Sequence, residues 1–367
     1  MFQNTNQIEM EDFHILTINP GSTSTKIAVY INANPIFVKT IRHTNEELAG
    51  FDKITDQYAF RKNIIYQELK EAEIKLDNIK AVVGRGGVIK AIPSGVYEVN
   101  EALMRDLFNS PVGEHASNLG GLIANDIAKT LPNARAFIAD PVTVDELCNY
   151  AMVTGHPLLK KVSIFHALNQ KAIAREHAKS IMRKYEDMNL IVVHLGGGIS
   201  VGAHQKGQVI DVNNALDGDG PFSPERSGTL PVGDLARLCF SGKYTQKEVL
   251  KMILGGGGLT AHLGTNNAYD VEQKAAEGDE HYKLIFEAMA YHVAKQIGSM
   301  SPVLNGEVDG ILITGGIAHS KWFVNMVIQR VYKIAPVYVY PGEDEMRALA
   351  MNGLMVLRGE AQPKIYV

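Results

Sequence analysis

The sequence has little cysteine and no long apolar run, and both absences narrow the classes of protein to which it can belong. Its 367 residues contain two cysteines, Cys148 and Cys239, which are far apart and outside any CxxC pair. They predict neither a disulfide framework nor a structural zinc site, and they indicate a reducing compartment. No apolar run approaches the roughly 18 residues that a membrane span needs. We therefore expect no membrane partner.

Excess charge of one sign is also absent. Lys and Arg number 36 and Asp and Glu number 40, which leaves a formal net charge of -4. A balance this even gives no electrostatic reason to expect nucleic acid as a partner, although basic side chains gathered in one cleft could still bind an anion. The segment Met1 to Asp12 lacks the basic and apolar regions of a secretory signal peptide, so we expect a cytoplasmic protein.

Two common nucleotide-binding motifs are missing as well. The sequence contains no GxxxxGK[ST] loop and no GxGxxG, which argues against a P-loop, a dinucleotide fold and a protein kinase. The segment Gly198 to Gly202 matches the GxSxG pattern of esterases. A nucleophile elbow leads into a helix, whereas the residues after Gly202 continue a β-like pattern, so we interpret this match as chance.

The sequence does contain a pattern of strands and turns that occurs twice. The segment His14 to Ile41 alternates apolar stretches with turns, which predicts three antiparallel strands, and a run starting near Leu190 has the same layout. Helical patterns occur at His166–Tyr185, Tyr282–Val303 and Met346–Arg358, and short β-rich segments at Ala81–Gly84, Ala136–Ala139, Gly310–Thr314 and Val337–Tyr340. We expect a duplicated α/β fold with a cleft between the halves, although any α/β protein alternates in a similar way.

Three turns have the composition of phosphate-binding turns. Asn19 to Lys26 (NPGSTSTK) combines backbone N–H groups, hydroxyls and a lysine, which suit polyphosphate oxygens but also a solvated hairpin tip. In His194 to Ser200 (HLGGGIS), glycines would let the backbone approach phosphate. Leu312 to Ile317 (LITGGI) leads into a predicted helix near Ser320, as either an anion site or a plain connection. We assign no role to the glycine run Gly255 to Gly258.

Two arginines stand in Gly-rich surroundings that offer them little packing. Arg85 lies in VVGRGG and Arg226 in PERSGT, and their planar guanidinium groups suit carboxylate or phosphoryl oxygens. Asp140 ends a predicted strand, and His115 and His166 each open a predicted helix. Residues at such positions are often only caps or surface side chains.

Taken in order, these segments resemble a known family. NPGSTSTK, VVGRGG, ADPVTVDEL, HLGGGISVGAH, DGDGPFSPERSGTLP and ITGGIAHS resemble the acetate kinase branch of the superfamily of sugar kinases, actin and the large heat-shock chaperones. Within that branch the sequence is most similar to the butyrate kinases, from Asn19 to Arg358. The resemblance implies an α/β fold of duplicated actin-like (ribonuclease H-like) βββαβαβα domains flanking a central cleft. Residues 1–165 with about 345–367 would form the N-terminal domain, and residues 166–344 the C-terminal nucleotide-binding domain.

The resemblance also implies roles for individual residues. Arg85 and Arg226 would bracket the acyl carboxylate and the migrating phosphoryl, Asp140 would position metal or nucleophile, His166 would hydrogen-bond the transferring group, and His115 would bind substrate together with Arg85. The two phosphate turns and the adenosine contact would be formed by Asn19, Ser22, Ser24, Lys26, Gly196, Gly197, Gly198, Gly315 and Gly316.

Two positions depart from the acetate kinase pattern. Acetate kinases place Asn where Gly197 stands and a magnesium-binding Glu where His319 stands. Histidine is a poor ligand for a hard cation that prefers oxygen, so the metal would depend on Asp140, the phosphates and water. Both departures favour the butyrate kinases over the acetate kinases.

The implied reaction is butanoate + ATP = butanoyl phosphate + ADP, by direct in-line phosphoryl transfer with ATP and Mg²⁺ as cofactors. A covalent intermediate on His166 is the competing mechanism. An acetate, propionate or branched-chain acid kinase is the alternative, because no motif fixes the length of the acid. A nucleotide-operated binding protein of the actin or chaperone class would not need Arg85 and Arg226. The resemblance also implies a homo-oligomer of unspecified size.

Overall fold

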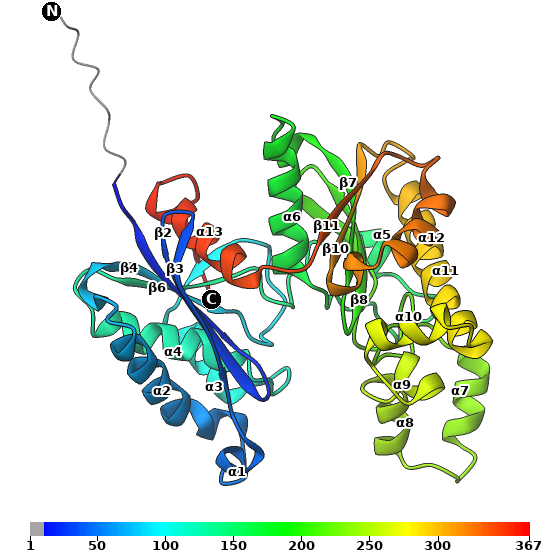
Figure 1. Cartoon of the computed structure of the whole chain (residues 1–367), viewed down its shortest axis with the longest axis horizontal. Helices are drawn as coiled ribbons and strands as arrows, with labels where there is room; N and C mark the ends of the chain where they lie inside the picture. Colours follow the sequence, from blue (N-terminus) through cyan, green and yellow to red (C-terminus); the bar gives the residue numbers. More distant parts are fainter. Residues whose placement is uncertain (1–10) are drawn as a thin grey trace, which may run out of the picture. The chain divides into compact units, whose positions relative to one another are not determined.

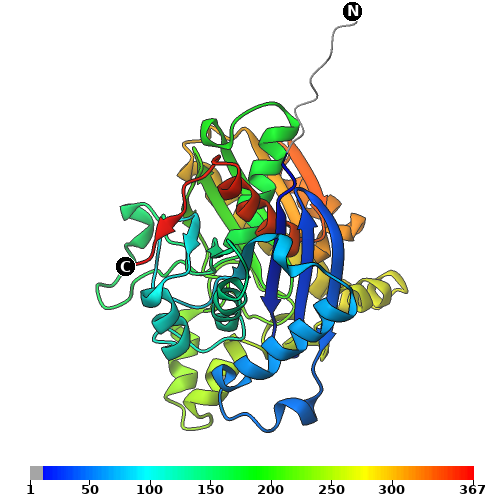
Figure 2. The ribbon, with the colours of Figure 1, turned by 90° about the vertical axis from the view of Figure 1, so that its left-hand side faces the viewer.

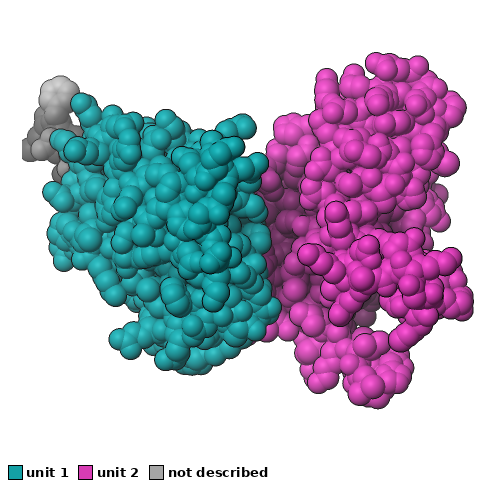
Figure 3. Space-filling view, turned by 90° about the horizontal axis from the view of Figure 1, so that it is seen from below, with its two compact units in different colours: residues 1–90, 95–141, 345–367 teal, residues 91–94, 142–344 magenta. Residues whose placement is uncertain are grey.

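The computed structural model describes residues 11–367, which divide into two units. Unit 1 comprises residues 11–90, 95–141 and 345–367, and unit 2 comprises residues 91–94 and 142–344 (Figure 3). Residues 142–165, which the sequence assigned to the N-terminal domain, have their contacts in unit 2. The first ten residues of that predicted domain, and most of the segment searched for a signal peptide, lie outside the described residues. The predicted domain limits stay a prediction.

Unit 1 is built on a seven-stranded mixed sheet with the order β12-β5-β6-β4-β1-β2-β3 (Figure 1). Its strands are β1 (His14–Pro20), β2 (Ser24–Ile31), β3 (Asn34–Arg42), β4 (Ile79–Arg85), β5 (Val96–Glu98), β6 (Arg135–Ala139) and β12 (Lys364–Ile365). Strands β1 to β3 form an antiparallel meander, β4 runs parallel to β1, and β6 runs parallel to β4. The three strands predicted from His14 to Ile41 are therefore confirmed.

Helices cover both faces of this sheet. The helices of unit 1 are α1 (Asn45–Leu48), α2 (Tyr58–Glu71), α3 (Glu101–Asn109), α4 (Asn118–Lys129) and α13 (Glu345–Leu357). Val83 faces Gly353 of α13, whereas a Cβ on the next residue, Gly84, would overlap the backbone of Gly120 in α4. Since neighbouring residues of a strand point to opposite faces, α13 and α4 pack on opposite sides of β4. Figure 2 looks onto this unit, with α13 in red beside the blue strands.

Unit 2 repeats the central arrangement of unit 1. Its sheet has the order β11-β10-β7-β8-β9, with β7 (Asn189–Leu195), β8 (Ile199–Gln205), β9 (Gln208–Val212), β10 (Gly310–Gly315) and β11 (Val337–Pro341). Strands β7 to β9 are an antiparallel meander, and β10 and β11 continue in parallel. The order and directions are the same as in β6-β4-β1-β2-β3. The strands predicted from Leu190 and the expected duplication are therefore confirmed.

The helix that comes after the last central strand of one sheet packs on the other sheet, and so belongs to the unit of the sheet that it covers. The helices of unit 2 are α5 (Asn149–Met152), α6 (Ala167–Ser180), α7 (Val232–Cys239), α8 (Gln246–Ile253), α9 (Gly258–Leu263), α10 (Ala268–Ala276), α11 (Glu280–Val303) and α12 (Lys321–Val331). Helix α6 follows β6 in the chain but packs on β7 and β10, and α13 follows β11 but packs on β1 and β4. This exchange is a second sign of duplication.

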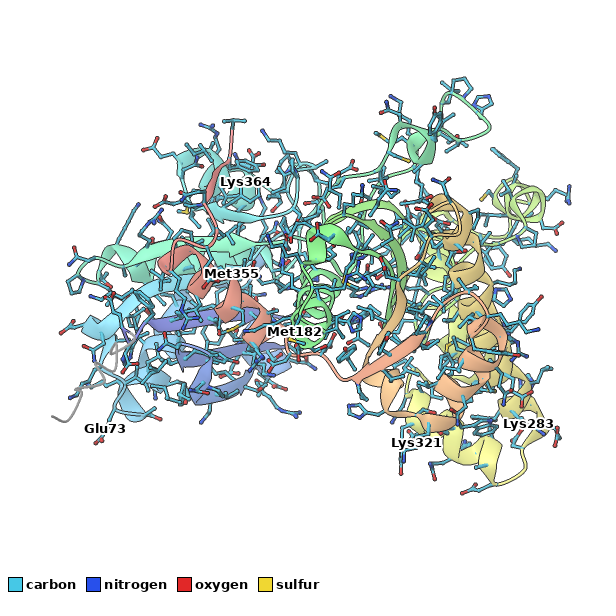
Figure 4. The ribbon with its side chains drawn as sticks, turned by 90° about the horizontal axis from the view of Figure 1, so that it is seen from above. Glu73, Met182, Lys283, Lys321, Met355 and Lys364 are labelled. Atoms are coloured by element: carbon cyan, nitrogen blue, oxygen red, sulfur yellow. The ribbon has the colours of Figure 1, made fainter. Side chains whose placement is uncertain are left out.

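The core of unit 2 lies between its sheet and helices α11 and α12. Phe286 and Met289 of α11, Phe323 of α12 and Ile313 of β10 are all fully buried there. Helix α12 begins at Lys321 (Figure 4), where the hydroxyl of Ser320 accepts a hydrogen bond from the N–H of Phe323. Within residues 11–367, no helix is both long and apolar enough to span a bilayer.

Candidate active site

A buried arginine of α2 supports the turn between β1 and β2. Arg61 is 1% exposed, and its guanidinium donates to the carbonyl oxygens of Gly21 (2.8 Å), Ser22 (2.9 Å) and Ser24 (2.9 Å). Burial lowers the pKa of Arg61 to about 10, so the side chain stays charged at neutral pH. Because Arg61 occupies these carbonyls, the shape of the predicted phosphate turn is fixed from inside unit 1. The predicted residue Ser22 is exposed on this turn, and Ser24 and Lys26 are half-buried.

We expect Arg61→Ala to lower the free energy of unfolding by about 3 kcal/mol, because several carbonyl acceptors lose a charged donor. Urea unfolding measures the loss. The exposed Arg42 on β3 provides the matched control, and Arg42→Ala is expected to change stability by no more than about 0.5 kcal/mol. Equal losses in the two variants would contradict the supporting role of Arg61.

Three side chains from distant parts of the chain meet at one edge of the sheet of unit 1. Glu345 opens α13, and its Oε1 lies 3.1 Å from Nη2 of Arg85. Its other oxygen accepts from Nη1 of Arg85 at 3.2 Å and from Nδ2 of Asn19. Nη1 of Arg85 also donates to Oδ1 of Asn19 at 3.3 Å. The sequence predicted Asn19 and Arg85 as site residues and missed Glu345.

Asp140 and His115 belong to the same region of unit 1. Arg85 pairs with Ala139 across β4 and β6, so Asp140 follows at the edge where Arg85 lies. Asp140 is 2% exposed with φ 38, and its Oδ1 accepts from the N–H of Gly95 at 2.8 Å. A left-handed conformation is unfavourable for an aspartate and persists only where its surroundings hold it. Burial, and then the charge of Arg85, lowers the pKa of His115.

Oxygen ligands for a small cation are available at this edge, but they are few. Within residues 11–367, no three or more His, Cys, Asp or Glu side chains converge as a metal site. Mg²⁺ commonly binds through one or two carboxylates, substrate phosphates and water, and Glu345 with Asn19 fits that pattern. The resemblance gave Asp140 as the protein ligand, because His319 stands where acetate kinases carry a magnesium-binding Glu. His319 lies exposed in unit 2, on the 3₁₀ turn Gly316–His319.

In unit 2, the turn between β7 and β8 lies directly against Arg226. A Cβ on Gly198 would overlap the guanidinium, so only glycine leaves room for it. Nη1 of Arg226 donates to the carbonyl of Ala215 at 2.7 Å, whereas Nε is buried and meets no acceptor among residues 11–367. Burial lowers the pKa of Arg226. A buried donor without an acceptor costs free energy, and an anionic ligand would supply the missing oxygen.

A pocket of about 590 Å³ opens beside this turn. It is lined by Gly196 and Gly197, by α10 with the loop before it, and by the segment from Gly316 to the start of α12. This volume is within the usual range for small-molecule sites. Gly315, predicted to contact adenosine, is not part of the lining. Its φ is +96 and a Cβ there would overlap the backbone of Leu195, so it allows β10 to approach β7 closely.

His166 precedes α6 and lies in a group of buried polar side chains in unit 2. Its ring stacks on that of His194, with centroids 3.8 Å apart and planes 15° apart. Nδ1 of His166 lies 2.9 Å from Oγ of Ser200 on β8. His194 is 2% exposed, and its Nδ1 lies 2.8 Å from Oδ1 of Asn169. His166 was a predicted site residue, whereas its neighbours Ser200 and His194 were not.

The predicted site residues therefore fall into local groups in each unit. In unit 1 the structure brings together Asn19 and Arg85, with Asp140 at the same sheet edge. In unit 2 it brings Gly198 against Arg226, while Gly196, Gly197 and Gly316 share the lining of one pocket. The chemical role of each residue stays a prediction.

The chain is similar to known proteins along almost its whole length. The model of the acetokinase family matches residues 153–353. Butyrate kinase 2 of Clostridium acetobutylicum is 55% identical over 354 residues, which cover 96% of this chain and 99% of that protein. A probable butyrate kinase of Bacteroides thetaiotaomicron is 54% identical over 352 residues, with 96% and 99% covered.

Solved structures of two further kinases share the fold. Acetate kinase of Porphyromonas gingivalis has a TM-score of 0.75 at 17% identity, covering 94% of this chain and 100% of that one. A propionate kinase from Francisella tularensis subsp. tularensis has a TM-score of 0.72 at 19% identity, with 93% and 98% covered. These likenesses agree with two actin-like units of α/β architecture, as the resemblance implied. On the identity to its relatives and the match of the family model, the chain belongs to the acetokinase family.

Proposed function

We propose that the protein phosphorylates butanoate with ATP, giving butanoyl phosphate and ADP, and that it works with Mg²⁺. The observation that carries the proposal is the Arg226 guanidinium, which lies partly buried against a glycine turn and whose Nε has no acceptor among residues 11–367. The choice of acid is supported by relatives that are 55% identical and called butyrate kinases.

The chemistry of the acceptor explains why arginines matter more than a general base. A carboxylic acid has an ordinary pKa of about 4 to 5, so the acceptor is already an anion at neutral pH. Its difficulty is the approach to a negatively charged triphosphate. Positive groups must cancel this repulsion and hold the reacting atoms in line.

The proposed roles follow the two local groups. In unit 1, Arg85 binds the carboxylate with His115 nearby, Asp140 positions the reacting groups, and the turn residues Asn19, Ser22, Ser24 and Lys26 bind phosphate oxygens. In unit 2, Gly196 to Gly198 and Gly316 bind the nucleotide. Arg226 stabilises charge on the transferring phosphoryl, and His166 donates a hydrogen bond to it. We propose direct in-line transfer.

Two acidic groups and one amide could hold the cation. Mg²⁺, when bound, would neutralise charge on the phosphates. Glu345 and Asn19 offer a carboxylate and an amide oxygen at the edge of the sheet where Asp140 also lies. Arg85 bonds to both Glu345 and Asn19, so it would orient these ligands as well as bind the acid.

The test is acyl phosphate formation from ATP and Mg²⁺ with a panel of acids, trapped with hydroxylamine. We expect the highest kcat/KM with butanoate, and a value at least about tenfold lower with acetate, because each missing methylene loses about 1–3 kcal/mol. A maximum at acetate, propionate or a branched acid would favour those alternatives. Product from none of the acids would overturn the proposal and favour a nucleotide-operated binding protein.

We also propose a cytoplasmic location, where ATP is supplied, and a homo-oligomer. Fractionation of the native cells addresses the first, and sedimentation of the purified chain addresses the second. The number of subunits is left to that measurement.

A further inference from the structure

A buried chain of hydrogen bonds leads from the core of unit 2 to His166. The hydroxyl of Tyr185 lies 2.7 Å from Nδ1 of His204, and Nε2 of His204 lies 2.9 Å from Oε1 of Gln170. Nε2 of Gln170 lies 2.8 Å from Oγ of Ser200, which in turn lies 2.9 Å from Nδ1 of His166. His204, Gln170 and Ser200 are all 0% exposed. Bulk solvent therefore does not reach these three side chains.

One backbone carbonyl determines which atoms donate and which accept along this series of hydrogen bonds. The carbonyl oxygen of Ser200 lies 3.1 Å from Nε2 of Gln170, and a carbonyl can only accept. The reverse orientation of the amide would place two oxygens in contact. The amide nitrogen of Gln170 therefore faces Ser200, and its oxygen faces His204, whose Nε2 must carry a proton.

The protonation state of His204, far from His166 in this series, agrees with that assignment of donors and acceptors. Burial, and then the charges of Lys171 and Arg175, keeps the pKa of His204 well below its ordinary value. His204 is therefore neutral, with its proton on Nε2 and a lone pair on Nδ1. That lone pair accepts from the hydroxyl of Tyr185, so both ring nitrogens are satisfied.

The contacts of the Ser200 hydroxyl determine which ring nitrogen of His166 carries the proton. The oxygen of Ser200 accepts from the amide of Gln170, so its hydroxyl proton needs an acceptor of its own. Among residues 11–367, the hydroxyl oxygen also contacts the backbone N–H of His166 at 3.5 Å, which is a donor like the amide of Gln170. Nδ1 of His166 is the acceptor that the hydroxyl meets, which leaves the ring proton on Nε2.

We propose that Ser200, oriented by Gln170, is a positioning residue that holds His166 in the tautomer with its proton on Nε2. The inference rests on the role of His166 in the proposed function. A protonated Nε2 can donate a hydrogen bond to a phosphoryl oxygen, but it has no lone pair with which to attack phosphorus. The network therefore favours direct transfer over a covalent intermediate on this histidine.

The tautomer can be read directly by ¹⁵N NMR of the full chain labelled at histidine, with His166→Gln used to assign the signals. We expect a pyridine-like shift at Nδ1 and a pyrrole-like shift at Nε2 of His166 near neutral pH. In Ser200→Ala the two tautomers should mix. A proton on Nδ1 in the wild type, or an unchanged spectrum in Ser200→Ala, would overturn the inference. The wild-type measurement needs no substrate.

Kinetics give the second readout. We expect Ser200→Ala to lower kcat about tenfold, which corresponds to the loss of one hydrogen bond, with the KM for ATP nearly unchanged. Ser200→Thr keeps the hydroxyl and should restore both the tautomer and most of kcat. If Ser200→Thr behaved like Ser200→Ala, the hydroxyl would not be the cause.

Ser163 provides the matched control. It is 4% exposed, and its hydroxyl donates to the carbonyl of Val144 at 2.7 Å. Ser163→Ala therefore loses a comparable buried bond, and should keep the wild-type tautomer and kcat. If Ser163→Ala and Ser200→Ala lowered kcat equally, the loss would be the general effect of removing a buried hydrogen bond, and the inference would be overturned. If the wild type phosphorylated no acid, the proposed function would fail while the tautomer could still be measured.

Discussion

Arg226→Ala is expected to lower kcat for acyl phosphate formation by about 10²–10³-fold, the usual loss when a donor to the transition state is removed. The guanidinium is partly buried beside the Gly196 to Gly198 turn, and its Nε meets no acceptor within residues 11–367. This Nε–H group is therefore an unsatisfied donor, and an oxygen of the transferring phosphoryl would supply its acceptor. Initial rates at saturating ATP and butanoate measure the effect.

The control is an exposed arginine that pairs with an aspartate of its own helix. Arg237 on α7 is 77% exposed and pairs with Asp234 at 2.6 Å. Arg237→Ala should leave kcat within about twofold of the wild type, because exposed ion pairs contribute little. Arg226→Lys keeps the charge without the planar fork, and should recover only part of the rate. Near wild-type turnover in Arg226→Ala would exclude Arg226 from the reaction.

Most of the strands, and the helices α6, α11 and α13, could be predicted from the sequence because their signals are local. The alternation from His14 to Ile41 and the run from Leu190 each contain their own turn residues, and both became meanders. The exchange of α6 and α13 between the sheets has no local signal. It depends on which apolar surface each helix covers, and that surface lies far away in the chain.

Candidate site residues could be recognised in the sequence where their residue type differed from that of their neighbours. Arg85 and Arg226 stand among glycines, whereas Glu345 looks like an ordinary acid in the first turn of a helix and lies 260 residues from Arg85. Arg61, in YAFRKN, looks like a surface arginine but is 1% exposed. Gly315 was selected as a ligand contact, but it allows β10 to approach β7 closely. A glycine that leaves room for a ligand and one that leaves room for a neighbouring strand look the same in sequence.

Gly198→Ala tests the position of Arg226 without removing its charge. The added Cβ would overlap Nη1 and Cζ of Arg226, so the guanidinium must move away from the turn. We expect kcat to fall by about 10²-fold, close to the loss in Arg226→Ala, because a misplaced donor no longer meets the transferring phosphoryl. Thermal unfolding should stay cooperative, since the overlap is with the end of a flexible side chain and not with backbone.

A glycine with open space around it provides the control, because its change to alanine adds a Cβ without displacing any side chain. A Cβ on Gly298 in α11 would meet nothing within 4 Å, so Gly298→Ala should keep the wild-type kcat and stabilise the helix by up to about 1 kcal/mol. The double variant Gly198→Ala with Arg226→Ala should lose no more activity than Arg226→Ala alone, because both changes act through one guanidinium. Additive losses would mean that Gly198 serves catalysis by another route, such as the approach of phosphate to the turn.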